Sequence, residues 1–250
     1  MQFESYYLPL GNLSLMPNSI ELWALNMTGL PGPPGSVLSK NMSNEGSRLE
    51  ALQQQRFLQR FYLRLILASY LETPAANIRI KKTSQGKPFV EVKGKTLACP
   101  PLYFSLSHVG QQWLLAICAE HPVGVDMERL DRDIRQPLRI ARRYFHPLEV
   151  DWLTHLEIKE MKSNWLRLWT CKEAVVKATG GGIVSGLDRF AVSMTGSTPN
   201  ISSIVNADED DLLHQLELHQ FMLDEQHTIA LACHPTIKHV NGRHLKLESR

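Results

Sequence analysis

The sequence lacks the features that mark membrane, secreted and fibrous proteins. Its longest strongly apolar run, residues 113–119, falls far short of the roughly 20 residues that a membrane-spanning helix needs. The first residues contain no basic segment followed by an apolar one, so they do not resemble a signal peptide. None of the four cysteines belongs to a C-x-x-C pair of the kind found in zinc sites. We therefore expect a cytoplasmic protein with reduced thiols and no membrane segment.

A marked excess of charge of one sign is also absent. The 27 basic and 25 acidic residues give a net charge of +2, which argues against bulk binding of nucleic acid. A hydrophobic share of 43% and a charged share of 21% are ordinary for a globular protein, and they exclude a disordered chain. A length of 250 residues fits either one large domain or two small ones.

Strand-like and helix-like segments occur in both halves of the chain, which predicts an α/β or α+β fold. A capping-box pattern at Ser47 and Glu50 opens a helix expected over residues 47–72, before Pro74. A weak internal repeat relates residues 112–118 to residues 226–232. The other helices are expected over residues 129–143, 148–155 and 160–179, and strands over residues 78–81, 89–92, 103–106, 113–119, 123–127, 190–194 and 228–233.

The segment V-G-V-D-M-E, which begins at Val123, has the strongest chemical signal. Side chains alternate along a strand, so Asp126 and Glu128 share one face with Gly124 while the apolar residues face a core. Adjacent carboxylates repel each other, and Mg²⁺ is a cation that would offset this repulsion. A glycine beside them would leave room for a ligand to approach the backbone. The alternative is the solvent-exposed face of an edge strand.

Three further groups of residues carry possible chemistry. Glu173 and Lys177 lie one turn apart on the last predicted helix. They belong either to a binding site or to an ordinary ion pair on the surface. The turn that contains Lys87 could hold a phosphate, although it lacks the P-loop pattern. The strand that ends in His108 contains serines, but they do not form a nucleophile elbow. The arginines Arg56, Arg60 and Arg64 form a helical stripe that either faces solvent or receives a phosphate.

In their order along the chain, these segments resemble the 4′-phosphopantetheinyl transferase family, in its longer surfactin-synthetase-activating type. The matching motifs are G-K-P at 86–88, L-S-H at 106–108, V-G-V-D-M-E at 123–128 and W-x-x-K-E-A-x-x-K at 169–177. The resemblance implies transfer of the phosphopantetheine arm of coenzyme A to a serine of an apo carrier protein, with release of 3′,5′-ADP and dependence on Mg²⁺. It also implies a monomer made of two similar, pseudo-symmetric halves, each a small sheet packed with a long helix, with the active site at the seam.

The resemblance also implies roles for individual residues. Asp126, Glu128 and Glu173 would hold the metal, and Lys177 would bind the pyrophosphate of coenzyme A. The catalytic residues would be Glu173, Lys177 and Asp126. The segment around Glu149 matches the family irregularly, and we assign it no catalytic role. Further coenzyme A contacts are expected from four side chains: Lys82, Lys87, His108 and Arg56.

Residues 1–120 and 121–250 are the expected halves, the first with the coenzyme A elements and the second with the metal motifs. A cluster of six arginines over residues 129–143 would attract a carrier protein, an acidic helical bundle, or else form a solvated face. Two other functions remain open. One is a Mg²⁺-dependent phosphoester hydrolase that uses the same carboxylates, and the other is a non-catalytic binding module.

Overall fold

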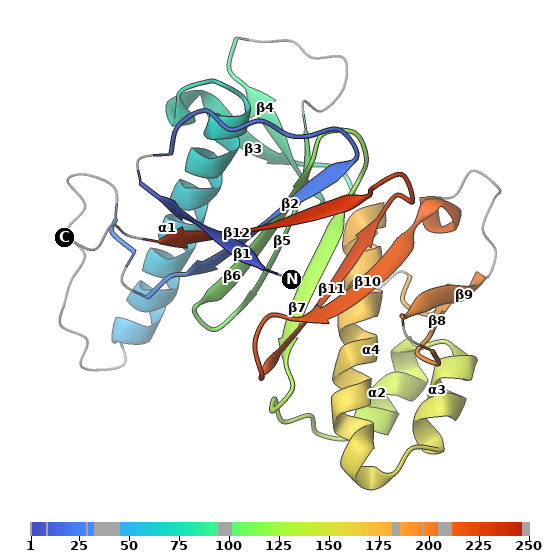
Figure 1. The fold of residues 1–250 in the computed structure, drawn as a ribbon. Helices are drawn as coiled ribbons and strands as arrows, with labels where there is room; N and C mark the ends of the chain where they lie inside the picture. The colour runs from blue at the N-terminus through green and yellow to red at the C-terminus, as the bar shows by residue number, and fades with distance from the viewer. Residues whose placement is uncertain are drawn as a thin grey trace.

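The protein is described here by a computed structural model that covers residues 2–8, 10–28, 30–32, 46–94, 102–181, 186–196, 198–204 and 212–246. Within these ranges no helix is long and apolar enough to cross a membrane. The elements in chain order (Figure 1) are β1 (Phe3–Tyr7), β2 (Ser19–Asn26), α1 (Gly46–Tyr70), η1 (Ala75–Asn77), β3 (Ile78–Lys82), β4 (Pro88–Val92), β5 (Tyr103–Val109), β6 (Gln112–Cys118), β7 (Gly124–Arg129), α2 (Pro137–Tyr144), α3 (Pro147–Thr154), α4 (Ile158–Thr179), β8 (Phe190–Ser193), β9 (Asn200–Ile204), η3 (Leu212–Gln215), β10 (Glu217–Met222), β11 (His227–Cys233) and β12 (His239–Lys246).

Two lobes repeat one arrangement of strands around a long helix (Figure 1). The first lobe contains the neighbouring strands β2-β6-β5 with α1, and the second contains β7-β11-β10 with α4. In each lobe the opening strand precedes the long helix, and the last of these three strands lies between the other two. This confirms the predicted fold class of two similar halves. The two segments of the weak repeat form β6 and β11, the middle strands.

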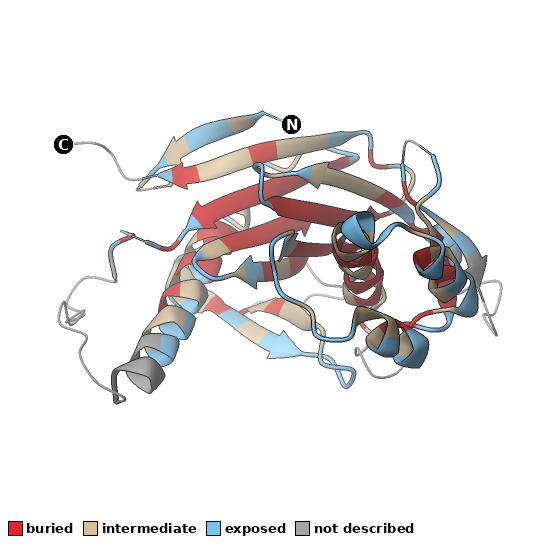
Figure 2. Cartoon of the chain, turned by 90° about the horizontal axis from the view of Figure 1, so that it is seen from below, coloured by how far each residue is buried: buried red, intermediate tan, exposed pale blue. Residues whose placement is uncertain are grey.

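A shared core joins the lobes. Apolar side chains from β2 and β6 pack against those from β7 and β11, and Figure 2 shows these strands as mostly buried. Val123, Val125 and Met127 all belong to this core, as the alternation along the strand predicts. The rings of His121 and His234, which follow the two middle strands, stack with centroids 4.0 Å apart. The seam between the lobes is therefore a packed interface.

One strand crosses between the halves of the chain. β12 lies between β1 and β2 and runs parallel to both, so a segment near the end of the chain completes the first sheet. The buried carboxylate of Glu21 accepts hydrogen bonds from Asn241, at 2.9 Å, and from Arg243. The division into residues 1–120 and 121–250 stays a prediction, with β12 as the strand that crosses it.

The predicted helices agree with the structure except for the start of one of them. The helix expected over residues 129–143 begins only at Pro137, because Gln136 adopts a left-handed conformation with φ of 57° immediately before it. The side chains of the expected capping box lie outside the described residues. The strands β9, β10 and β12 were not predicted, since their sequences lack a regular alternation of apolar residues.

Candidate active site

The helix α4 lies directly against β7, and Gly124 makes this close approach possible. A Cβ atom at this position would overlap the carbonyl oxygen of Ala174 and lie 2.5 Å from the amide nitrogen of Ala178. The expectation that Gly124 leaves room for a ligand is therefore wrong, because the helix backbone occupies that space. The same contact brings the inner face of β7 to the polar side chains of α4.

At this contact, Asp126 of β7 meets Glu173 and Lys177 of α4. The Lys177 ammonium donates to Asp126 Oδ1 at 2.7 Å and to two backbone carbonyls, of Leu106 at 3.1 Å and of Val125 at 3.2 Å. Asp126 and Glu173 are only 6% and 5% exposed. The structure thus brings together, within one buried cluster, three of the residues expected at the site.

The electrostatics of the cluster favour a bound cation. Burial and then the neighbouring Asp126 raise the pKa of Glu173 to about 7, although Lys177 opposes this shift. Burial also raises the pKa of Glu128, against the effect of Arg132, which forms an ion pair with it. Burial is the largest cause of both shifts, and a cation bound between the carboxylates would offset it.

Two carboxylate oxygens show where a cation would fit. Asp126 Oδ2 and Glu173 Oε1 are buried and have no hydrogen-bond partner among the described residues. A buried carboxylate oxygen without a partner is costly, and a hard cation is a suitable ligand for it. Throughout the described ranges, no three acidic, histidine or cysteine side chains converge closely enough to ligate one ion. At this site Lys177 bonds to Asp126, and Arg132 bonds to Glu128.

Two cavities meet at Leu106, Glu173 and Lys177. One has a volume of about 340 Å³ and continues along the G-K-P turn and past Gly180. The other has a volume of about 590 Å³. Its wall includes six more residues that matter here: Ser107, His108, Asp126, Glu128, Arg132 and Trp169. A long substrate could therefore pass across the carboxylates and Lys177 from one cavity to the other.

The four expected coenzyme A contacts are placed differently. Lys87 lines the first cavity and donates to the carbonyl of Ala178, and burial lowers its pKa to about 8. His108 lines the second cavity, and burial together with Lys177 lowers its pKa. Lys82 on β3 and Arg56 on α1 are exposed and line neither of these two cavities. Gln55, beside Arg56, donates to the carbonyl of Gly110, which places this part of α1 near the turn after His108.

A buried ion pair behind the site was not predicted. The Lys172 ammonium donates to Glu149 Oε1 and to the carbonyl of Phe190, both at 2.7 Å, and both charged side chains are at most 1% exposed. Glu149 also accepts from the backbone amides of Val192 and His146, the second of which closes the capping box of α3. The sequence signal was that the helical neighbours of Lys172, at positions 168, 169, 175 and 176, are all apolar. The pair fixes α4 to α3 and β8, one residue away from Glu173.

Two lobes meet at a seam that holds carboxylates suited to a cation, two lysines and a histidine. Such a set of groups is typical of enzymes that act on phosphate groups, where catalysis depends on positioning and on neutralising charge. The comparisons with known proteins specify the class further. A family model described as the 4′-phosphopantetheinyl transferase superfamily matches residues 122–232, and one described as 4′-phosphopantetheinyl transferase, N-terminal, matches residues 49–120.

Individual relatives agree with the family models. The 4′-phosphopantetheinyl transferase HetI of Nostoc sp. is 30% identical over 193 residues, which are 75% of this chain and 79% of HetI. The L-aminoadipate-semialdehyde dehydrogenase-phosphopantetheinyl transferase of Xenopus laevis is 30% identical over 69% of this chain and 60% of its own length. The 4′-phosphopantetheinyl transferase Sfp of Bacillus subtilis is 27% identical over 53% of this chain and 54% of its own length.

The chain belongs to the 4′-phosphopantetheinyl transferase superfamily. It is thus a transferase that moves the phosphopantetheine group of coenzyme A to a carrier protein. The comparisons give no support to the alternative of a phosphoester hydrolase.

Proposed function

We propose that Asp126, Glu128 and Glu173 hold Mg²⁺ during the transfer. The observation that carries this proposal is the pair of buried, unpartnered oxygens on Asp126 and Glu173. Glu128 would join them after releasing Arg132, its partner in the structure. When bound, Mg²⁺ would neutralise charge on the pyrophosphate oxygens of coenzyme A.

The remaining groups have roles in binding and in proton transfer. Lys177 would orient the pyrophosphate, and Lys87 and His108 would contact phosphates from the two adjoining cavities. The hydroxyl oxygen of the carrier serine attacks the phosphorus that bears the pantetheine arm, and the bond from that phosphorus to 3′,5′-ADP breaks. Glu173 would also help to remove the serine proton, directly or through a water molecule. Lys82 and Arg56, both exposed, stay predictions for the outlying phosphate of coenzyme A.

The reaction can be tested by intact-mass analysis of an apo carrier protein incubated with this protein, coenzyme A and Mg²⁺. We expect the mass of the carrier to increase by one phosphopantetheine group. Excess EDTA should abolish the increase, and excess Mg²⁺ should restore it, because the carboxylates need the cation. The absence of any increase with fatty-acid, polyketide and nonribosomal-peptide carriers would refute the transferase. Full activity in EDTA would refute the metal site alone.

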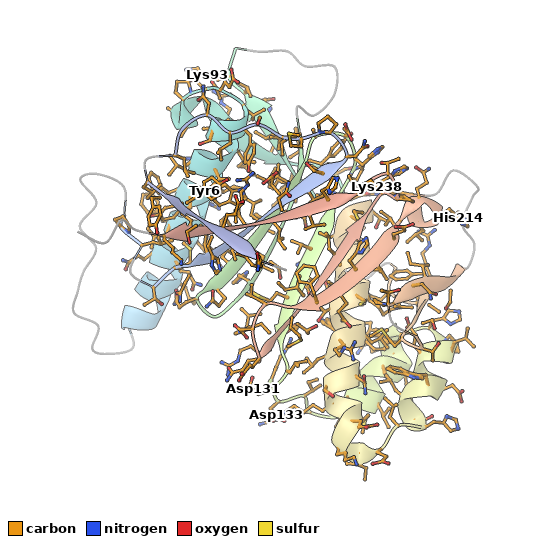
Figure 3. All side chains as sticks on the ribbon, in the orientation of Figure 1. Tyr6, Lys93, Asp131, Asp133, His214 and Lys238 are labelled. Atoms are coloured by element: carbon orange, nitrogen blue, oxygen red, sulfur yellow. The ribbon has the colours of Figure 1, made fainter. Side chains whose placement is uncertain are left out.

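We also propose that the carrier is an acidic helical bundle that binds beside the metal site. All six arginines of the cluster over residues 129–143 are exposed. Arg129 pairs with Asp131 and Arg132 pairs with Glu128, whereas the other four have no carboxylate partner among the described residues. Figure 3 shows Asp131 and Asp133 in the loop between β7 and α2, away from the body of α2. The excess positive charge would steer an acidic partner to the seam.

Charge reversal on α2 tests this docking surface. We expect the double substitution Arg139→Glu and Arg142→Glu to lower kcat/KM for the carrier by about tenfold or more at low salt, mainly through KM. The matched control is Arg79→Glu with Lys93→Glu, which makes the same change in charge at exposed positions of the first lobe that line neither cavity. Steady-state rates at several salt concentrations measure the effect. Equal losses in the two variants would contradict a docking site on α2.

A monomer is proposed because one chain already supplies both sides of the seam. Lys87 and His108 come from the first lobe, and Asp126, Glu173 and Lys177 come from the second. The cytoplasmic location and the lack of nucleic-acid binding stay predictions, the second supported by the nearly balanced charge.

A further inference from the structure

The strands β5 and β7 lie side by side at the seam but belong to different sheets (Figure 1). Two serine side chains of β5 form the connection between them. The amide of Val125 donates to Ser105 Oγ at 3.0 Å, and the amide of Met127 donates to Ser107 Oγ at 3.1 Å. The contacts follow the same order along both strands, so the strands run parallel. Hydroxyl groups here accept the hydrogen bonds that backbone carbonyls accept in a sheet.

This connection keeps the two backbones apart and leaves a place for Lys177. The carbonyls of Leu106, which lies between the two serines, and of Val125 both accept from the Lys177 ammonium. In a continuous sheet, carbonyls between neighbouring strands accept from backbone amides instead. The serine connection is therefore what allows a lysine from α4 to bond to both strands.

Ser107 has a second contact that bears directly on Asp126. Its hydroxyl donates to Asp126 Oδ1 at 2.8 Å, the same oxygen that accepts from Lys177 at 2.7 Å. Both donors therefore act on one carboxylate oxygen, and Oδ2 is left without a partner. The orientation of Asp126 thus follows from the position of Ser107, and Oδ2 is the oxygen that stays free for a ligand.

We propose that Ser105 and Ser107 are positioning residues for the transfer reaction. They connect β5 to β7, and Ser107 also holds Asp126 so that Oδ2 is free. Ser105 is 4% exposed and Ser107 is 5% exposed, so both act from within the protein, through Asp126 and Lys177. This inference rests on the proposed function of the same site, because it assigns the serines to the support of its carboxylate and lysine.

Amide hydrogen exchange, followed by NMR on the protein without coenzyme A or carrier, tests the hydrogen bonds. We expect Ser105→Ala to increase exchange selectively at Val125, and Ser107→Ala to increase it at Met127. The control is Ser69→Ala, which removes a buried hydroxyl that bonds within α1, to the carbonyl of Leu65. Unchanged exchange at Val125 and Met127 in the two seam variants would overturn the connection.

Steady-state kinetics test the positioning role. Loss of a side chain that orients a metal ligand typically costs about 10–100-fold in activity or metal affinity. We expect Ser107→Ala to lower kcat by that factor and to raise the Mg²⁺ concentration for half-maximal rate, with little change in KM for coenzyme A. Ser69→Ala should leave kcat and the Mg²⁺ concentration for half-maximal rate near their wild-type values. Ser105→Ala provides a second test if Ser107→Ala does not fold. An inactive wild type would refute the proposed function. An active wild type with fully active, folded seam variants would refute only the positioning role.

Discussion

Replacing Asp126 by asparagine is expected to reduce the transfer rate by about 10²–10³-fold, the range seen when one preorganised polar group is removed from an active site. Asparagine keeps the shape of the side chain but removes its negative charge. Lys177 would lose its charged partner, and the proposed cation would lose the free oxygen Oδ2. Initial rates of carrier modification at saturating coenzyme A and Mg²⁺ measure this effect.

The control for this variant is Asp133→Asn. Asp133 is exposed in the loop between β7 and α2, so the same chemical change should leave the rate within about twofold of wild type. Equal melting temperatures for the two variants would show that the difference between them is catalytic. A rate for Asp126→Asn within tenfold of wild type would mean that the cation is held elsewhere.

Replacing Lys172 by methionine is expected to destabilise the protein by about 3–5 kcal/mol, because it leaves a buried carboxylate without its partner. Lys172 is fully buried, with its ammonium bonded to Glu149 and 4.2 Å from the ring centre of Phe190. Methionine would fill much of the space but could neither donate a hydrogen bond nor carry a charge. Urea denaturation, with the m value compared between variants, measures the loss in the free energy of unfolding.

A second lysine–glutamate pair at the start of the same helix provides the control. Lys159 contacts Glu157 at 2.8 Å, but the two side chains are 76% and 68% exposed. Exposed pairs contribute about 0–1 kcal/mol, so Lys159→Met should change the free energy of unfolding only slightly. Adding Glu149→Gln to Lys172→Met should recover part of the loss, because glutamine is neutral and can still accept from one of the two backbone amides that bond to Glu149. Similar losses for the two lysine variants would contradict the structural role of the buried pair.

Some of the site follows from the local sequence pattern. Alternation along β7 correctly separates Val125 and Met127, which face the core between the lobes, from Asp126, which faces α4. Helical periodicity places Glu173 and Lys177 one turn apart on α4. These arrangements extend over a few residues, where backbone geometry alone determines which side chains share a face. The order of the motifs along the chain was sufficient to identify the family.

The rest depends on contacts between distant parts of the chain. Ser107 and Asp126 are 19 residues apart, and Glu149 and Lys172 are 23 apart, so no helical or strand period relates them. Gly124 illustrates the same limit. A glycine at this position is compatible with an open ligand site, but the backbone of α4 fills the space beside it. Only the folded chain brings β5, β7 and α4 together, because the apolar core between the lobes and the packing of α4 against β7 set their distances. That distance decides which polar atoms find partners and which carboxylate oxygens remain free.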